Sequence, residues 1–215
     1  RSSAASDVYK RQLFREAARR ASEKTAESAL FNENLAALNA NDAAGAAALV
    51  KEAAGSAQLR EHILFEQAHY AAKRMNPQAP ELLASFVALA TDPALKTQAR
   101  LDQAEVALNL NPPDLETVQA ILPPLEKEQL TPEQTMQLAR LNILEAESRQ
   151  EWPSAIQACR QAIALDSEGK QADMLYLKLG ELLYKNGDFH EAQLVLQPFP
   201  SKSVSYTHLT LPTIA

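Results

Sequence analysis

A set of small or apolar residues recurs five times along this chain, and this internal repeat constrains the possible folds more than any other feature. Within each set the spacing is four residues and then three, which places the members on one face of a helix. Successive sets lie 36 or 37 residues apart: Ala46/Val50/Ala53, Leu82/Phe86/Leu89, Val118/Leu122/Leu125, Ala155/Cys159/Ala162 and Ala192/Leu196/Phe199. A period of about 20–50 residues is typical of solenoids and other repeat arrays. We expect the first residue of each set to be buried where two paired helices approach most closely.

The segment 174–199 shows the repeating unit in full, as two short amphipathic helices joined by a polar turn. Asn186-Gly187 is expected to end the first helix, and Asp188 to cap the second in a capping box with Glu191. The apolar face of the first helix consists of Leu175, Leu179, Leu182 and Leu183. Equivalent first-helix positions, one in each unit from the second to the fifth, are Phe65, Leu101, Leu138 and Leu175.

This unit resembles the tetratricopeptide repeat (TPR) family, whose pattern is W-x2-L-G-x2-Y, then A-x3-F, then P. The first helix matches as Tyr176-x2-Leu179-Gly180-x2-Leu183, and the second as Ala192-x3-Leu196. The preceding unit keeps the second helix as Ala155-x3-Cys159, with Ser167 in place of the proline. Its first helix departs from the family, with Asn142 and Ile143 in place of Leu and Gly. The resemblance is close over 131–199 and limited to the apolar pattern before that.

The resemblance implies an all-α fold, a right-handed superhelical solenoid of about five antiparallel helix hairpins over residues 13–202. The hairpins are expected over 13–55, 58–90, 93–127, 131–167 and 171–199. Thr131-Pro132-Glu133-Gln134 predicts a helix start with an N-cap, a first-turn proline and a capping-box partner. Pro123-Pro124 is expected to end or kink the preceding helix near Ile121, because proline lacks an amide donor and clashes with the preceding turn.

Residues 1–12 and 203–215 share none of this periodicity and resemble translated sequencing-adapter sequence. We expect both strings to lie outside the folded unit as non-native tails; native disordered tails are the alternative. On the first interpretation the native N-terminus is missing. The sequence then leaves the compartment open between bacterial cytoplasm and periplasm.

Composition narrows the class of partner. The chain carries a net charge of −6, which argues against nucleic acid because nucleic-acid binding demands a basic surface. Nothing in the repeat units predicts direct contact with a membrane. Aromatic residues make up only 6% of the chain, which suits close packing of alanine-rich helices. The single cysteine excludes an internal disulfide.

The sequence predicts no catalytic residues, no metal site and no cofactor. His62, Glu66 and His69 share one predicted helix face, but the two histidines lie about 10 Å apart along the helix axis, too far to bind one metal ion. Cys159 is expected to be a small buried hydrophobe, since no base or cation accompanies it. Trp152 is expected to wedge between helices, in register with Phe189.

By the same resemblance, the first helices of successive hairpins line a concave groove. The expected groove residues are Arg100, Gln103, Arg140, Leu144, Glu147, Leu177, Glu181 and Tyr184. Some relatives of this family bind a C-terminal carboxylate in a Lys/Asn/Arg clamp, but the clamp asparagines are not in place here.

The resemblance implies a protein–protein interaction scaffold that binds a protein or peptide segment in this groove, and not an enzyme. Two alternatives stay open. One is a bacterial cell-envelope assembly or lipoprotein-type TPR factor, and the other is the docking part of a larger enzyme.

Overall fold

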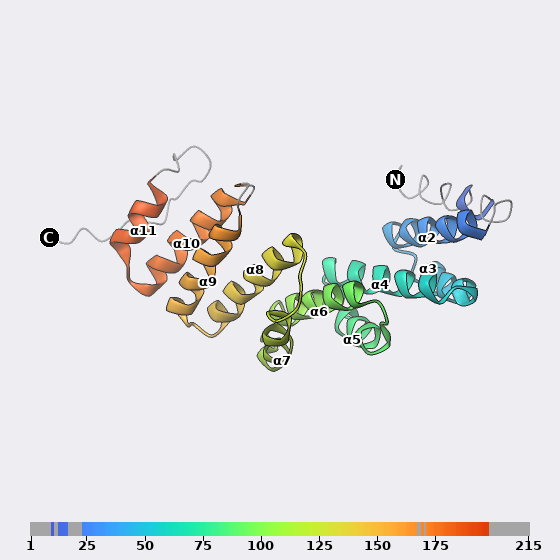
Figure 1. The fold of residues 1–215 in the computed structure, drawn as a ribbon, viewed down its shortest axis with the longest axis horizontal. Helices are drawn as coiled ribbons and strands as arrows, with labels where there is room; N and C mark the ends of the chain where they lie inside the picture. Colours follow the sequence, from blue (N-terminus) through green and yellow to red (C-terminus); the bar gives the residue numbers. More distant parts are fainter. Residues whose placement is uncertain (1–9, 11–12, 17–22, 167–168, 170, 198–215) are drawn as a thin grey trace. The chain divides into compact units, whose positions relative to one another are not determined.

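The structure is a computed structural model that describes residues 10, 13–16, 23–166, 169 and 171–197 (Figure 1). Within these residues all regular structure is helical, so the expected all-α class is confirmed. None of the helices in this part of the chain has the length and hydrophobicity of a membrane span. The two terminal strings fall outside the described residues, apart from Lys10.

Eleven helices are described, one of them a short 3₁₀ helix, η1. Their bounds are α2 Glu23–Asn39, α3 Ala43–Glu52, η1 Ala53–Gly55, α4 Ala57–Lys73, α5 Ala79–Leu89, α6 Pro93–Leu108, α7 Leu115–Leu125, α8 Pro132–Ser148, α9 Trp152–Leu165, α10 Ala172–Asn186 and α11 Phe189–Leu196.

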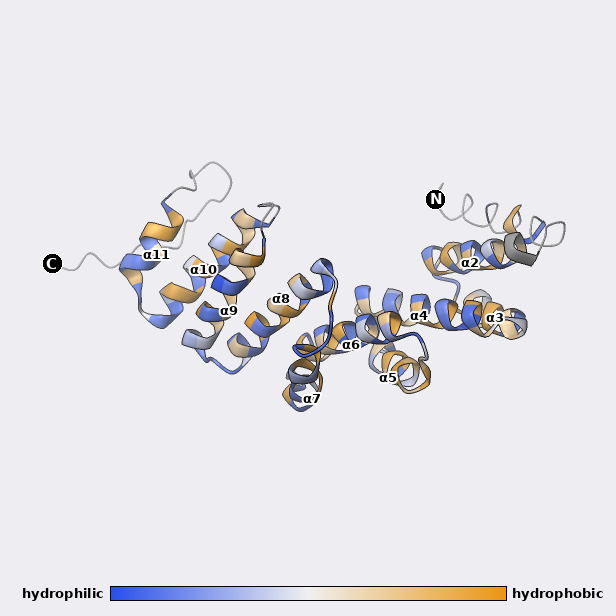
Figure 2. Ribbon diagram, in the orientation of Figure 1, coloured by the Kyte–Doolittle hydropathy of each residue, from blue (hydrophilic) through white to orange (hydrophobic). Residues whose placement is uncertain are grey.

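The chain divides into two compact units, Arg1–Gln129 and Leu130–Ala215. In the first unit, α2 packs on α3, α4 on α5 and α6 on α7, and neighbouring pairs also contact each other. In the second, α9 lies between α8 and α10, and α10 packs on α11 (Figure 1). Hydrophobic and hydrophilic residues alternate along each helix (Figure 2), as amphipathic packing requires. Helices therefore pack against their neighbours in sequence order.

The first-helix series forms part of the core in every hairpin where it was expected. Phe65, Leu101, Leu138 and Leu175 are all buried. The second-helix series is confirmed at four of its five positions, since Ala46, Val118, Ala155 and Ala192 are buried as well.

The remaining member of the second-helix series, Leu82, was predicted wrongly to be buried. Leu82 is 38% exposed and Leu89 is 70% exposed, whereas Ala79, Leu83 and Phe86 are buried. The buried residues keep the spacing of four and then three but begin three positions earlier, where α5 itself begins. The start of α5 keeps the period, since Ala79 lies 36 residues from the starts of α3 and α7. What differs in α5 is therefore which positions of the helix are buried, and not where the helix begins.

Pro123-Pro124 were expected to end or kink α7 near Ile121, and the first of these alternatives is wrong, because α7 continues to Leu125. The two prolines leave the carbonyl groups of Gln119 and Ala120 without helical donors. Both of these residues are exposed, so water can solvate their carbonyl groups. The buried side chain of Leu125 supplies a packing gain that favours the extra turn.

The predicted helix ends have mixed outcomes. Thr131 and Gln134 form the expected capping box at the start of α8. Gly187 ends α10 in the left-handed conformation, with φ at 91°. The capping box at Asp188 is wrong, because its carboxylate accepts a hydrogen bond from the Asn186 side chain at 2.7 Å. Glu191, its expected partner, forms an ion pair with Arg160 of α9.

A partly buried histidine–aspartate pair joins α4 to α6 in the first unit. His69 Nδ1 lies 2.5 Å from Oδ2 of Asp102, whose side chain is only 1% exposed. Gln98 donates a second hydrogen bond to Asp102, at 3.1 Å. The hydrogen bond to Asp102 raises the pKa of His69 above its ordinary value, and it outweighs the opposing effect of burial.

This pair predicts a pH-dependent stability. A raised pKa means that the folded chain holds the imidazole proton more tightly than the unfolded chain, so the stabilisation is complete below a pH of about 6.5 and is lost as the pH rises through the folded pKa. Asp102→Asn should remove most of the difference in the free energy of unfolding between about pH 6 and about pH 8.5. The measurement is urea denaturation followed by circular dichroism, with His62→Gln on the same helix as the control. An unchanged pH dependence in Asp102→Asn would contradict the assignment.

The close packing of α10 against α11 at Gly180 leads to a second prediction, which concerns stability. A Cβ atom at Gly180 would lie 2.5 Å from Cγ of Leu196, which is too close. Overpacking costs about 1–3 kcal/mol, and the better helix propensity of alanine offsets about 1 kcal/mol. Gly180→Ala should therefore lower the free energy of unfolding by about 1 kcal/mol. Gly55→Ala is the matched control, because nothing lies within 4 Å of a Cβ there. Equal or greater stability of Gly180→Ala would refute the close approach.

Candidate functional site

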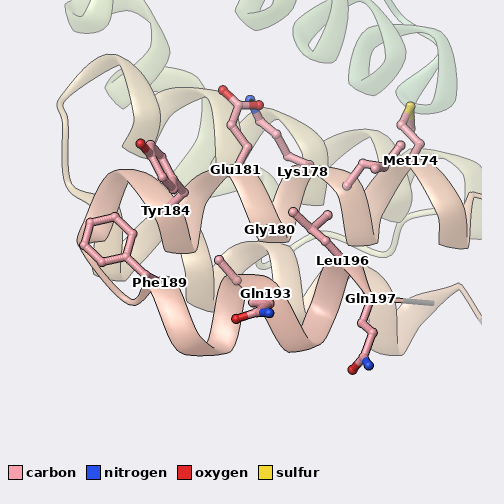
Figure 3. Close-up of a pocket in the computed structure, with 11 residues that line it drawn as sticks. Met174, Lys178, Gly180, Glu181, Tyr184, Phe189, Gln193, Leu196 and Gln197 are labelled. Carbon is pink, nitrogen blue, oxygen red and sulfur yellow. Dashed lines mark hydrogen bonds and ion pairs between the residues drawn. The ribbon is translucent and has the colours of Figure 1, made fainter. Parts of the chain in front are cut away.

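A cleft of about 770 Å³ lies along α10 and α11, the last hairpin of the second unit (Figure 3). Three large apolar side chains that line the cleft are exposed to solvent: Met174 by 51%, Tyr184 by 39% and Phe189 by 52%. Exposed apolar surface gathered in a concave site is typical of a binding site for a protein or another apolar ligand.

The floor and the ends of the cleft have different chemistry. The floor consists of Gly180 and Leu196, together with the buried Ala192. At one end the rings of Tyr184 and Phe189 meet edge to face, with centroids 5.2 Å apart. Figure 3 shows Leu196 between this ring pair and Met174, which lies towards the start of α10. The cleft therefore offers an apolar floor between an aromatic end and a methionine end.

The polar rim of the cleft, Lys178 and Glu181, belongs to an ion-pair network that ties α10 to α8. Glu147 of α8 accepts from Lys178 at 2.7 Å and from Lys185 at 2.9 Å. Glu181 accepts from the same two lysines, from Lys185 at 2.6 Å and from Lys178 at 3.3 Å. Two carboxylates and two ammonium groups balance, so the rim adds no net charge to the cleft.

The network shifts the pKa of two of its members. Burial alone would raise the pKa of Glu181, but its hydrogen bonds and charge interactions with Lys185 and Lys178 outweigh burial and lower it. The hydrogen bond to Glu181 raises the pKa of Lys185 against a smaller opposing effect of burial, and Glu147 adds to the increase. Both shifts favour the charged forms of Glu181 and Lys185.

The cleft brings together three of the eight residues predicted for the groove: Leu177, Glu181 and Tyr184. Glu147 does not line the cleft, and its side chain is only 15% exposed because it lies within the ion-pair network. Arg140 and Leu144 are exposed on α8 and do not line the cleft. Arg100 and Gln103 lie on α6 of the first unit, where Arg100 pairs with Glu128.

Sequence reasoning missed Phe189, which was expected to pack between helices. Its counterpart one period earlier, Trp152, is half-buried and lies under the ammonium group of Lys185, with 5.4 Å from Nζ to the ring centroid. Phe189 is followed by no further described helix that could cover it in the same way. In the sequence, the one indication that Phe189 would be exposed was its position in the last of the five repeat units.

The histidine and cysteine side chains that were considered for metal binding or catalysis make structural contacts. His69 pairs with Asp102, and no group of three or more potential metal ligands occurs among the described residues. Cys159 is fully buried as expected, and its thiol donates to the carbonyl of Leu175 at 3.4 Å. Burial raises the pKa of this thiol to about 11, which suppresses the reactive thiolate.

Comparison with known proteins adds no relative, since neither a protein-family model nor a curated protein nor a solved structure matches this chain.

The ion-pair network leads to a prediction for stability. Glu147→Gln removes the carboxylate that links α8 to both lysines of α10, and should lower the free energy of unfolding by about 1 kcal/mol at low salt. The loss should shrink in about 1 M NaCl, because salt screens charge interactions. Arg160→Gln is the control, since it breaks an ion pair whose two side chains are 52% and 48% exposed, and it should cost less than about 0.5 kcal/mol. Equal effects of the two substitutions in chemical denaturation would contradict a special role for the network.

Proposed function

We propose that this chain is a protein–protein interaction scaffold built as a TPR-like array, a right-handed solenoid of helix hairpins, and that it binds a protein or peptide segment. Packing of sequence-adjacent helices within each unit supports the array, because units of a solenoid contact only their neighbours. The buried series at Leu101, Leu138 and Leu175 supports a repeated unit of similar construction.

The observation that carries the proposal is the exposed apolar cleft of α10 and α11. Its aromatic pair, Tyr184 and Phe189, belongs to the residue types that anchor protein interfaces. The charged groups on its rim, Lys178 and Glu181, are engaged with each other. The cleft is therefore suited to recognising an apolar protein surface by shape, with its polar rim held in place.

Arg140 and Leu144 extend the candidate surface onto α8. Both are exposed, and the network of Glu147 holds α8 and α10 together next to them. A partner that crosses from the cleft onto α8 would contact an arginine, and arginine is frequent among interface anchors.

Partner capture tests this function. Tyr184→Ala should weaken a partner recovered by affinity purification by about 1–2 kcal/mol, and Arg140→Ala should do the same if the partner extends onto α8. Both side chains are exposed, so neither substitution should change the thermal midpoint much. Leu194→Ala is the matched control, because Leu194 is 54% exposed on α11 but does not line the cleft. If every recovered partner binds both variants with wild-type affinity, the proposed surface is wrong.

A further inference from the structure

We infer that the cleft of α10 and α11 binds an amphipathic α-helix of a partner protein, seated as α10 is seated on α8 and α9, with a basic side chain over the Tyr184–Phe189 ring pair. This inference rests on the proposed function and specifies the class of partner.

The repeat itself supplies the template for this interaction. A step of 37 residues carries Ile143, Ala155 and Cys159 of α8 and α9 onto the floor of the cleft, at Gly180, Ala192 and Leu196. The three residues of the earlier hairpin are buried in one cluster with the leucines of α10. The cleft is thus the next step of an interface that already exists within the second unit.

The helix that covers the earlier hairpin shows what the cleft can accept. α10 presents four leucines at a spacing of i, i+4, i+7 and i+8, all of them buried: Leu175, Leu179, Leu182 and Leu183. Its backbone touches the floor at Cys159, where the thiol donates to the carbonyl of Leu175. A partner with the same leucine spacing would present its apolar face to Leu196, which takes the place of Cys159.

The aromatic end of the cleft adds a preference for a cation. In the earlier hairpin, Lys185 of the covering helix lies over the ring of Trp152 and also pairs with Glu147. The same step of 37 residues replaces Trp152 by Phe189 and Glu147 by Tyr184. A lysine or arginine at the equivalent point of a partner helix would therefore meet two aromatic rings, where a cation–π contact replaces the ion pair.

The length of the cleft also suits a helix. It runs along α10 from Met174 to Tyr184, which corresponds to about 15 Å, or roughly three helical turns. Three turns accommodate the full leucine spacing of i to i+8. The edge-to-face pair of Tyr184 and Phe189 closes one end of the cleft.

A peptide with the sequence of α10, residues 172–186, is the direct probe, because it carries both the leucine spacing and the lysine. Fluorescence anisotropy of the labelled peptide titrated with the full chain should show saturable binding. Phe189→Ala and Tyr184→Ala in the chain should each weaken binding about tenfold, as expected for interface anchors. Leu194→Ala should leave the affinity unchanged. A peptide in which the residues equivalent to Leu179 and Leu183 are replaced by glutamate should not bind.

Each other outcome overturns the inference. Equal affinity of the wild-type chain and the Phe189→Ala chain would place the peptide elsewhere, for example in exchange for α10 itself. Concentration-dependent dimers in analytical ultracentrifugation that Phe189→Ala abolishes would make a second copy of the chain the occupant. If the peptide does not bind although Tyr184→Ala still weakens a captured partner, the helical partner is wrong and the proposed function stands. If both effects are missing, the proposed function fails as well.

Discussion

A single helix hairpin of this size cannot bury its own apolar faces, and the structure depends on this constraint throughout. In the second unit, Ala155, Cys159 and Ala162 of α9 are fully buried in one cluster to which α10 contributes Leu175 and Leu179. Small residues at these positions let the helices approach closely, and leucines from the neighbouring helix fill the remaining space. Each hairpin therefore leaves its core incomplete until the next helix packs against it.

The cleft follows from the same constraint. α10 buries four leucines in the core of the second unit, while Met174, Tyr184 and Phe189 of the last hairpin stay exposed. The ion pairs of Glu147 with Lys178 and Lys185 fix α10 relative to α8 independently of what lies on the cleft. A partner would thus meet a surface that is already held in shape, which reduces the entropy lost on binding.

Sequence reasoning recovered the features that depend on a helix and its nearest neighbours. The buried leucines of α10, the capping box at Thr131 and the turn at Gly187 all follow from local patterns. Leu82 was predicted wrongly because the period fixes where α5 begins but not which of its faces is buried, and α5 buries Ala79, Leu83 and Phe86 instead. α7 passes through its prolines because the buried Leu125 favours another turn. The exposure of Phe189 could not be predicted from its pattern, because the pattern fixes a position in the unit but not whether another helix covers it.

The buried thiol of Cys159 gives the second unit an internal reporter. It is the only cysteine of the chain, it is fully buried, and it donates a hydrogen bond across the interface between α9 and α10. A thiol-specific reagent can reach it only when these two helices separate, and the reaction then requires the thiolate that burial suppresses. Where reclosing is faster than the reaction, the rate of alkylation under native conditions therefore reports the population of the open interface, without any engineered label.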